Sequence, residues 1–205
     1  MFSVTFHTIP DSDCGVAHII EHSVLNGSKK YPVKSPLDIA IKGSLKTYIN
    51  ASTFKDRTSY PVSSLNEKDY FNLMGIYLDA TFNPLIYSDK RIFMQEGWHY
   101  ELTDANLPVQ YRGVVYGEMK GAFSNPFRYL SYYIYKHLFP DTGYGFDSGG
   151  VPSAIPLLTY AKFLDFHKKY YNPSNSFFVL YGDANIDKEL KYIDDVLKEC
   201  PKGTR

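Results

Sequence analysis

The sequence predicts an α+β fold, a two-layer sandwich in which helices pack on one face of a largely antiparallel sheet. Segments whose apolar residues alternate with a period of two occur together with segments whose apolar residues recur at helical spacing. The two kinds of segment do not follow one another in a regular βαβ order, which disfavours a parallel sheet. The chain of 205 residues is long enough to bury one sizeable core. We therefore expect a single domain over residues 1–205, and both of its ends break off beside predicted elements, which indicates a piece of a longer multidomain protein.

Elements in the first half of the chain follow from alternation, helical spacing and turn residues. They are a strand at residues 2–8, a helix at 15–25, a short helix at 36–42, and two strands within 47–63 joined by a turn near 55–57. Asn26 and Gly27 supply a stop signal for the first helix, and Gly43 closes the second.

The second half of the chain is predicted to be richer in helices. The expected elements are a helix between Asn66 and Asn83, a strand at 98–102, helices at 113–122, 129–138 and 159–170, a buried strand at 177–181 and an amphipathic helix at 187–199. Residues 139–156 hold several glycines and two prolines and are predicted to be a loop.

Charge balance and the lack of long apolar runs narrow the possible functions. Lys plus Arg and Asp plus Glu both number 22, so no basic field is available for phosphate backbones and we expect no nucleic-acid partner. No run of apolar residues is long enough for a membrane-spanning helix, and no secretory leader opens the chain. We therefore expect no membrane association and an intracellular protein.

Cysteines and aromatic residues add two weaker indications. Cys14 and Cys200 lie far apart and predict reduced thiols rather than a disulfide framework. Aromatic residues make up 17% of the chain. A core built of rings accounts for most of this share, and the alternative is that some rings line a peptide-binding surface.

His18, Glu21 and His22 form the pattern H-x-x-E-H, the inverse of the commoner H-E-x-x-H zinc signature. On a helix, residues four apart share one face, so both imidazoles can reach a single ion. Zinc lowers the pKa of a coordinated water from ~15.7 toward ~7, and Glu21 is placed to accept its proton. Chance occurrence on an ordinary helix is the alternative, and apolar neighbours that would bury this helix favour the functional interpretation.

A catalytic zinc site takes three protein ligands and keeps one open position. The candidates for the third ligand are Glu96, His99, Glu101, Glu118, His137 and His167. Glu118 is favoured by a modest margin because its predicted helix holds no other acid. Glu96 and Glu101 flank a predicted strand and are interpreted as support or packing groups. His137 and His167 end amphipathic helices, where the helix dipole explains them.

Eight segments together carry a resemblance that covers nearly the whole chain. They are residues 15–34, 43–45, 50–53, 56–61, 96–102, 117–121, 148–150 and 171–175. In these segments the sequence resembles the pitrilysin/insulysin family of inverted-zincin metallopeptidases, and within it the presequence protease branch, which includes falcilysin.

The resemblance implies a zinc metalloendopeptidase that hydrolyses unfolded oligopeptides, such as presequence-type peptides, in the cytoplasm or the matrix of a mitochondrion or plastid. It implies that His18, His22 and Glu118 are the ligands of one Zn²⁺ per domain and that Glu21 is the general base. It also implies that Asn50 and Ala51 belong to an edge strand that receives the substrate backbone by strand addition.

The sequence departs from the family pattern in two ways. Family enzymes close a chamber with a second half, whereas this chain carries only the zinc-bearing first domain, and the strand expected before Phe2 is absent or shortened. We therefore expect a partner domain or second half, and two alternatives stay open: an isolated domain that binds zinc without cleaving, and a non-catalytic subunit of the same fold. Other branches carry a glutamate where this chain has Tyr111, so no role is assigned to it. Cys14 precedes His18 by four positions and is interpreted as an inert thiol rather than part of the site.

Overall fold

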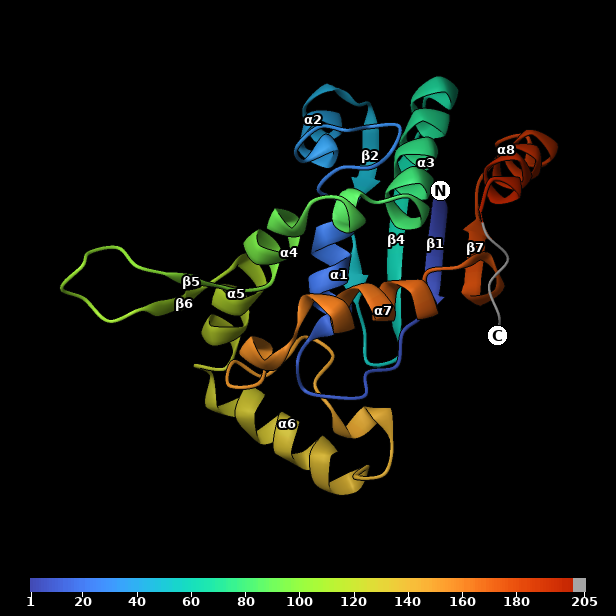
Figure 1. The fold of residues 1–205 in the computed structure, drawn as a ribbon. Coiled ribbons are helices and arrows are strands. Elements are labelled where there is room, and N and C mark those ends of the chain that lie inside the picture. Colours follow the sequence, from blue (N-terminus) through green and yellow to red (C-terminus); the bar gives the residue numbers. More distant parts are fainter. Residues whose placement is uncertain (201–205) are drawn as a thin grey trace.

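A computed structural model describes residues 1–200 of the chain, and Figure 1 shows its elements. The helices are α1 (Val16–Val24), α2 (Pro36–Gly43), α3 (Glu67–Phe82), α4 (Lys90–Glu96), α5 (Val114–Ala122), α6 (Pro126–Leu138), α7 (Tyr160–Tyr170) and α8 (Ile186–Lys198). The strands are β1 (Phe2–His7), β2 (Lys46–Ile49), β3 (Ser52–Thr53), β4 (Arg57–Ser64), β5 (His99–Glu101), β6 (Gln110–Arg112) and β7 (Ser176–Leu180). Short 3₁₀ turns lie at Leu85–Tyr87, Gly143–Gly145, Ile155–Leu157 and Pro173–Asn175.

The main sheet is antiparallel and has the strand order β2-β4-β1-β7, with β3 also paired to β4. Its register places Val4 opposite Tyr60 on one side and Phe178 on the other. Val4 and Tyr60 are fully buried beneath the helices, whereas Phe177 and Val179 on the other face of the sheet are 60% and 51% exposed. The predicted α+β sandwich with helices on one face is thus confirmed (Figure 1).

Helix α1 lies in the middle of the helical layer. Its apolar residues Val16, Ala17, Ile19, Ile20 and Val24 are all buried, and it packs against α4, α5 and α7. Helix α3 covers β4 and β1, and α8 packs on α3. Because other elements surround α1, its polar side chains lie close to residues from distant parts of the chain.

Gly15 brings the loop around Gly149 against the start of α1. Its backbone is left-handed, with φ at 66°, and a Cβ there would lie 2.5 Å from the carbonyl oxygen of Gly149. The loop is held in place by the amide of Val151, which donates to the carbonyl of Asp13 over 2.8 Å. Only glycine combines this conformation with so close an approach.

The predicted strand pair within residues 47–63 is correct except that its first strand is interrupted. β2 and β3 both pair with the same side of β4, and the ladder breaks between them opposite Pro61. Proline has no N–H to donate, so a regular antiparallel ladder cannot continue past it. The break leaves Asn50 and Ala51 at the edge of the sheet, outside any strand.

Four elements differ from the predictions. Helix α4 and strand β6 were not predicted, so Glu96 ends a helix instead of flanking a strand. Helix α6 begins at Pro126, because the side chain of Asn125 caps the amide of Phe127. Strand β7 was predicted to be buried, which is wrong, because it forms an edge of the sheet with one face exposed.

The dipole interpretation of His167 is also wrong. The ring is 2% exposed, and burial lowers the pKa of His167 to about 4, so it is neutral at pH 7. Nε2 lies 3.0 Å from the carbonyl oxygen of Thr81, which can only accept, so Nε2 carries the proton. Nδ1 then accepts from the hydroxyl of Tyr87 over 2.7 Å. His167 therefore joins α7 to α3 as a neutral core residue.

Cys14 and Cys200 are both free thiols. Cys14 lines a pocket of about 490 Å³ together with Val16 and Phe166 and does not belong to the group of metal-compatible side chains described below. Within residues 1–200, no helix has the length and apolar content needed to cross a membrane. Residues 201–205, on which the expectation about the end of the chain partly rests, lie outside the described residues.

Candidate metal centre

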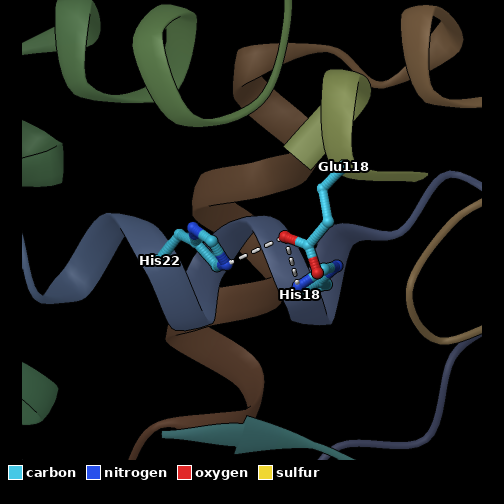
Figure 2. A group of neighbouring side chains, drawn as sticks. All are labelled: His18, His22 and Glu118. Carbon is cyan, nitrogen blue, oxygen red and sulfur yellow. Dashed lines mark ion pairs between the residues drawn. The ribbon is translucent and has the colours of Figure 1, made fainter. Parts of the chain in front are cut away.

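His18, His22 and Glu118 converge at one point between α1 and α5, as Figure 2 shows. Glu118 Oε2 lies 3.8 Å from His18 Nε2 and 3.7 Å from His22 Nε2. One ligand atom from each residue falls within 4.8 Å of the other two. The three residues that the sequence singled out as a ligand set are therefore brought together.

The helices explain this convergence. His18 and His22 are one turn apart on α1, whose opposite side is anchored in the core. On α5, Val115 and Met119 are buried, which turns Glu118 toward α1 while leaving its side chain 54% exposed. The other candidates for the third ligand do not join this group. Glu96 contacts His22 at Nδ1, on the other side of the ring. The remaining candidates have partners elsewhere: His99 with Met94, Glu101 with Arg112, His137 with Tyr133 and His167 with Thr81.

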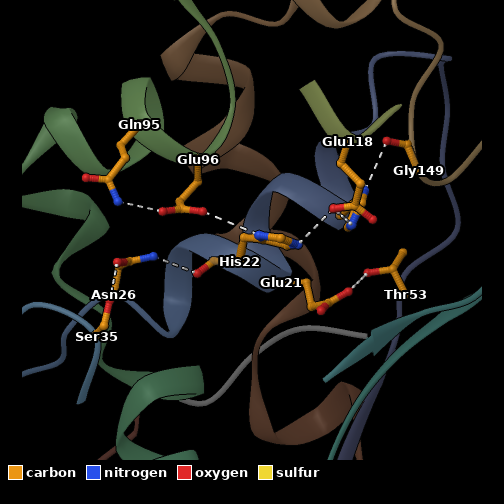
Figure 3. Close-up of polar contacts among 10 residues, drawn as sticks. Glu21, His22, Asn26, Ser35, Thr53, Gln95, Glu96, Glu118 and Gly149 are labelled. Atoms are coloured by element: carbon orange, nitrogen blue, oxygen red, sulfur yellow. Dashed lines mark hydrogen bonds and ion pairs between the residues drawn. The ribbon is translucent and has the colours of Figure 1, made fainter. Parts of the chain in front are cut away.

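Each histidine is also held from behind through its Nδ1 atom. His18 Nδ1 lies 3.2 Å from the carbonyl oxygen of Gly149. His22 Nδ1 lies 3.3 Å from Glu96 Oε2, as Figure 3 shows for these two residues. A carbonyl oxygen accepts but does not donate, so Nδ1 of His18 carries a proton and Nε2 is the nitrogen directed toward Glu118. This is the orientation that metal-binding histidines adopt when a second group fixes the ring.

The pKa values of His22 and Glu96 are shifted in opposite directions by their contact. Burial lowers the pKa of His22, but the hydrogen bond with Glu96 and the charges of Glu21, Glu96 and Glu118 outweigh it, and the net pKa is raised. Burial raises the pKa of Glu96, but hydrogen bonds from His22 and Gln95 outweigh it, and the net pKa is lowered. The surroundings of His22 therefore favour positive charge at this position.

The donor set is compatible with a metal ion. Two imidazole nitrogens and one carboxylate oxygen form the His₂Glu set found in catalytic zinc sites, which leave a fourth position open. The anchored Nδ1 atoms and the surplus of negative charge from Glu21, Glu96 and Glu118 both suit a divalent cation. The residues present therefore fit the zinc that the sequence pattern implies.

Glu21 faces a pocket beside these three residues. Its carboxylate Oε2 accepts a hydrogen bond from the hydroxyl of Thr53 over 2.7 Å, which ties α1 to β3 (Figure 3). The pocket has a volume of about 350 Å³ and is lined by Glu21, His22, Leu25, Asn26, Ser35, Leu37, Asn50, Ala51 and Glu96. The predicted base and the predicted substrate-binding residues thus share one cavity.

The backbone N–H and carbonyl of Asn50 form hydrogen bonds with two different residues. Its amide donates to the carbonyl of Pro61 over 3.2 Å, but Pro61 has no N–H to return the bond. The hydroxyl of Tyr77, a buried residue of α3, donates to the Asn50 carbonyl over 3.0 Å instead. The backbone at Asn50 and Ala51 is thereby fixed at the sheet edge, and its role in substrate binding stays a prediction.

Sequence reasoning missed three residues that shape this site, Thr53, Tyr77 and Gly149. It also missed the contact of Glu96 with His22. The family resemblance covers the segments that contain Thr53, Glu96 and Gly149, but no function was attached to Thr53 or Gly149. Glu96 was interpreted as a support group, which agrees with its position. Tyr77 gave no signal, because a buried helical tyrosine looks like any other core residue.

Two family models match the chain. The model described as Insulinase (Peptidase family M16) matches residues 9–103, and the model described as Peptidase M16 inactive domain matches residues 157–204. The first of these ranges contains the H-x-x-E-H pattern and the strands that follow it.

Curated relatives match over almost the whole chain. Protein HypA of Clostridium perfringens is 52% identical over 95% of this chain and 20% of its own length. Presequence protease 1 of Arabidopsis thaliana, chloroplastic/mitochondrial, is 48% identical over 96% of this chain and 18% of its own length. The mitochondrial presequence protease of Mus musculus is 43% identical over 95% of this chain and 19% of its own length. The chain spans about a fifth of the length of these relatives.

Solved structures show the same fold. The crystal structure of pitrilysin matches with a TM-score of 0.70 and 21% identity, over 98% of this chain and 20% of that chain. A protease from Helicobacter pylori matches with a TM-score of 0.73 and 18% identity, over 100% of this chain and 45% of that chain. Taken with the family models and the curated relatives, these findings show that the chain belongs to the M16 (insulinase) peptidase family, in its presequence protease-like branch.

Proposed function

We propose that this chain is the catalytic domain of a zinc metalloendopeptidase that hydrolyses unfolded oligopeptides, such as presequence-type peptides. The observation that carries the proposal is the convergence of His18, His22 and Glu118, with Glu21 directed into the adjoining pocket. The names of the Arabidopsis and mouse relatives support the substrate class, and they support a mitochondrial or plastid location.

The residues would divide the work as follows. His18, His22 and Glu118 would hold the ion, which when bound supplies Lewis acidity to an attacking water and to the scissile carbonyl. Glu21 would accept the proton of that water and return it to the leaving amine. Thr53 would keep the Glu21 carboxylate pointing into the pocket through the 2.7 Å hydrogen bond. The side chains at the site thus cover both metal binding and proton transfer.

The sheet edge supplies a means of capturing an extended peptide. Asn50 and Ala51 lie between β2 and β3, at the edge of the main sheet, and share the pocket with Glu21. A peptide laid along this edge would form main-chain hydrogen bonds regardless of its sequence, which suits diverse unfolded substrates and excludes folded ones. Strand addition would then place a peptide bond beside Glu21.

Because the chain spans about a fifth of its relatives, we infer that cleavage requires further protein. A second half of the enzyme, or a partner domain, would close a chamber over the sheet edge. Glu118 is 54% exposed, so the candidate metal centre is open to solvent on the side where such a partner could cover it. The isolated domain is then expected to bind zinc but to cleave poorly.

The decisive experiment uses the full-length protein with Glu21→Gln, assayed for zinc content and for cleavage of a fluorogenic peptide. The variant should retain zinc and lose cleavage, because the amide cannot accept the proton. Glu101→Gln, a change of the same kind at a carboxylate paired with Arg112 outside the site, should retain both. Cleavage by a zinc-loaded Glu21→Gln variant would refute the mechanism, and a wild-type protein that binds no zinc would refute the proposed function.

A further inference from the structure

Glu96 is a buried acid that contacts the candidate metal centre from outside. It is the last residue of α4 and is 5% exposed. Its Oε2 lies 3.3 Å from His22 Nδ1, whereas Glu118 approaches His22 Nε2 at 3.7 Å. Figure 3 shows the His22 ring between the two carboxylates. Within residues 1–200, the ion pair with His22 is the only one that Glu96 forms.

A carboxylate removed from water needs compensation from hydrogen bonds and positive charge. Gln95 donates one hydrogen bond to Glu96 Oε1 over 2.8 Å, and the remaining oxygen faces His22. A cation bound at His22 Nε2 would leave the ring proton on Nδ1 and would make that N–H a stronger donor. Glu96 is therefore placed to hold the Nδ1 hydrogen of His22 while a cation occupies the other ring nitrogen.

Glu96 is held rigidly enough to orient the ring rather than to follow it. Phe93, one turn earlier in α4, is buried against the core. At Gly97, directly after Glu96, a Cβ would lie 2.9 Å from the Phe93 carbonyl and 3.1 Å from Ile19 Cγ2 of α1. Helix α4 thus ends in close contact with α1, and the position of the Glu96 carboxylate is set by that packing.

The structure assigns to Glu96 the role of a positioning residue for the metal site, one that holds His22 with Nε2 toward His18 and Glu118. This inference rests on the proposed function. His18 offers an internal comparison, because its ring is held by the neutral carbonyl of Gly149 and not by a charge. Glu96 therefore contributes both orientation and charge, and its removal should weaken metal binding even though it is not a ligand.

The test measures zinc affinity of the full-length protein by competition with a chromophoric chelator, together with the absorption spectrum of the Co²⁺-substituted protein. Glu96→Gln should weaken zinc binding about 10-fold and Glu96→Ala about 100-fold, the range expected for groups that orient a ligand. The Co²⁺ spectrum should change in both variants, because His22 is freed to rotate. Glu101→Gln, which removes the charge of a carboxylate paired with Arg112, should leave affinity and spectrum unchanged.

Two results would overturn the inference, and they are distinguishable. If the wild-type protein binds zinc and both Glu96 variants match its affinity and spectrum, Glu96 has no positioning role and the proposed function stands. If the wild-type protein binds no zinc, the proposed function fails and this inference fails with it. Thermal unfolding of the metal-free variants monitors folding, and if Glu96→Ala does not fold, the nearly isosteric Glu96→Gln decides the question.

Discussion

Thr53 and Glu21 are joined by a 2.7 Å hydrogen bond from the threonine hydroxyl to the glutamate carboxylate. Thr53 belongs to β3, the short strand beside the open edge of the sheet, and Glu21 belongs to α1, which carries the two histidines. The bond links the segment proposed to receive substrate with the group proposed to move protons. Its removal should therefore affect turnover more than metal binding.

Thr53→Val keeps the shape of the side chain and removes its hydroxyl. Because a hydrogen bond to a charged group contributes about 1.5–3 kcal/mol, kcat should fall roughly 10- to 100-fold. KM and zinc content should change little. Thr53→Ser, which restores the hydroxyl, should recover most of the activity. Steady-state kinetics on zinc-verified preparations decides the matter, and equal kcat values for the valine variant and the wild type would contradict the assigned role.

Tyr77→Phe should give the opposite kinetic pattern. The change removes the donor to the Asn50 carbonyl, which Pro61 cannot replace, so the sheet edge loses its fixed geometry. Peptide binding should weaken, with KM raised by about 5- to 10-fold for a loss of about 1 kcal/mol, while kcat changes less. Isothermal titration of an uncleaved peptide into Glu21→Gln protein, with and without Tyr77→Phe, measures this directly. Unchanged peptide affinity would show that the edge at Asn50 does not bind substrate.

Zinc should raise the free energy of unfolding of the protein as well as support the proposed activity. A ligand that binds only the folded state adds about 2.7 kcal/mol to the free energy of unfolding at a concentration 100-fold above its Kd. The Tm of the wild-type protein should therefore rise with added zinc and fall with a chelator. His18→Ala should abolish this response, whereas His137→Ala, at an exposed site on α6, should preserve it. A zinc response that survives His18→Ala would place the ion elsewhere.

Gly15→Ala is expected to destabilise the protein by about 1–3 kcal/mol, because the left-handed backbone and the 2.5 Å approach to Gly149 both oppose a Cβ. It should also weaken zinc binding, because the carbonyl that holds His18 must move away. Gly121→Ala, in a helical position with open space around it, should instead stabilise the protein by about 0.5–1 kcal/mol. Chemical denaturation of both variants provides the comparison. Equal stability of Gly15→Ala and the wild type would contradict the close contact.

The buried His167 should make stability depend on pH. Its folded-state pKa of about 4 lies below the unfolded value near 6.5, so the unfolded chain binds the additional proton between these limits. The resulting loss of stability begins as the pH falls below about 6.5 and reaches about 3 kcal/mol near pH 4. Urea denaturation at pH 7.5 and pH 5 should show this decline. His167→Gln should be less stable at pH 7.5 but should lose less on acidification, and an equal decline in both proteins would exclude His167 as the cause.

Much of the site could be predicted because it depends on local sequence. The spacing of His18 and His22 on a helix requires no knowledge of the rest of the fold. Glu118 was favoured only modestly, because residue patterns do not show which distant helix faces α1. The structure adds the missing relation by packing Val115 and Met119 into the core. The general architecture followed from patterning for the same reason, since apolar periodicity reflects which face of an element is buried.

The features that could not be predicted depend on tertiary contacts. Helix α4 has only seven residues, too few for a clear helical period, and its importance comes from the contact of Glu96 with His22. The interruption at Asn50 reflects Pro61 on a neighbouring strand, which sequence reasoning did not align with it. β7 was predicted to be buried because its residues are apolar, but Phe177 and Val179 lie on the open face of the sheet.

The contact between His18 and Gly149 spans 131 positions of the chain, and it also depends on Gly15 leaving room for the loop. Helix α1 has nine residues, too few to be stable alone in water, so the two histidines are not presented together until the rest of the fold surrounds them. The candidate metal site is therefore expected to form late in folding, after the ribosome has released the loop near Gly149. Occupancy of the candidate site by a metal ion would then report that a molecule has finished folding.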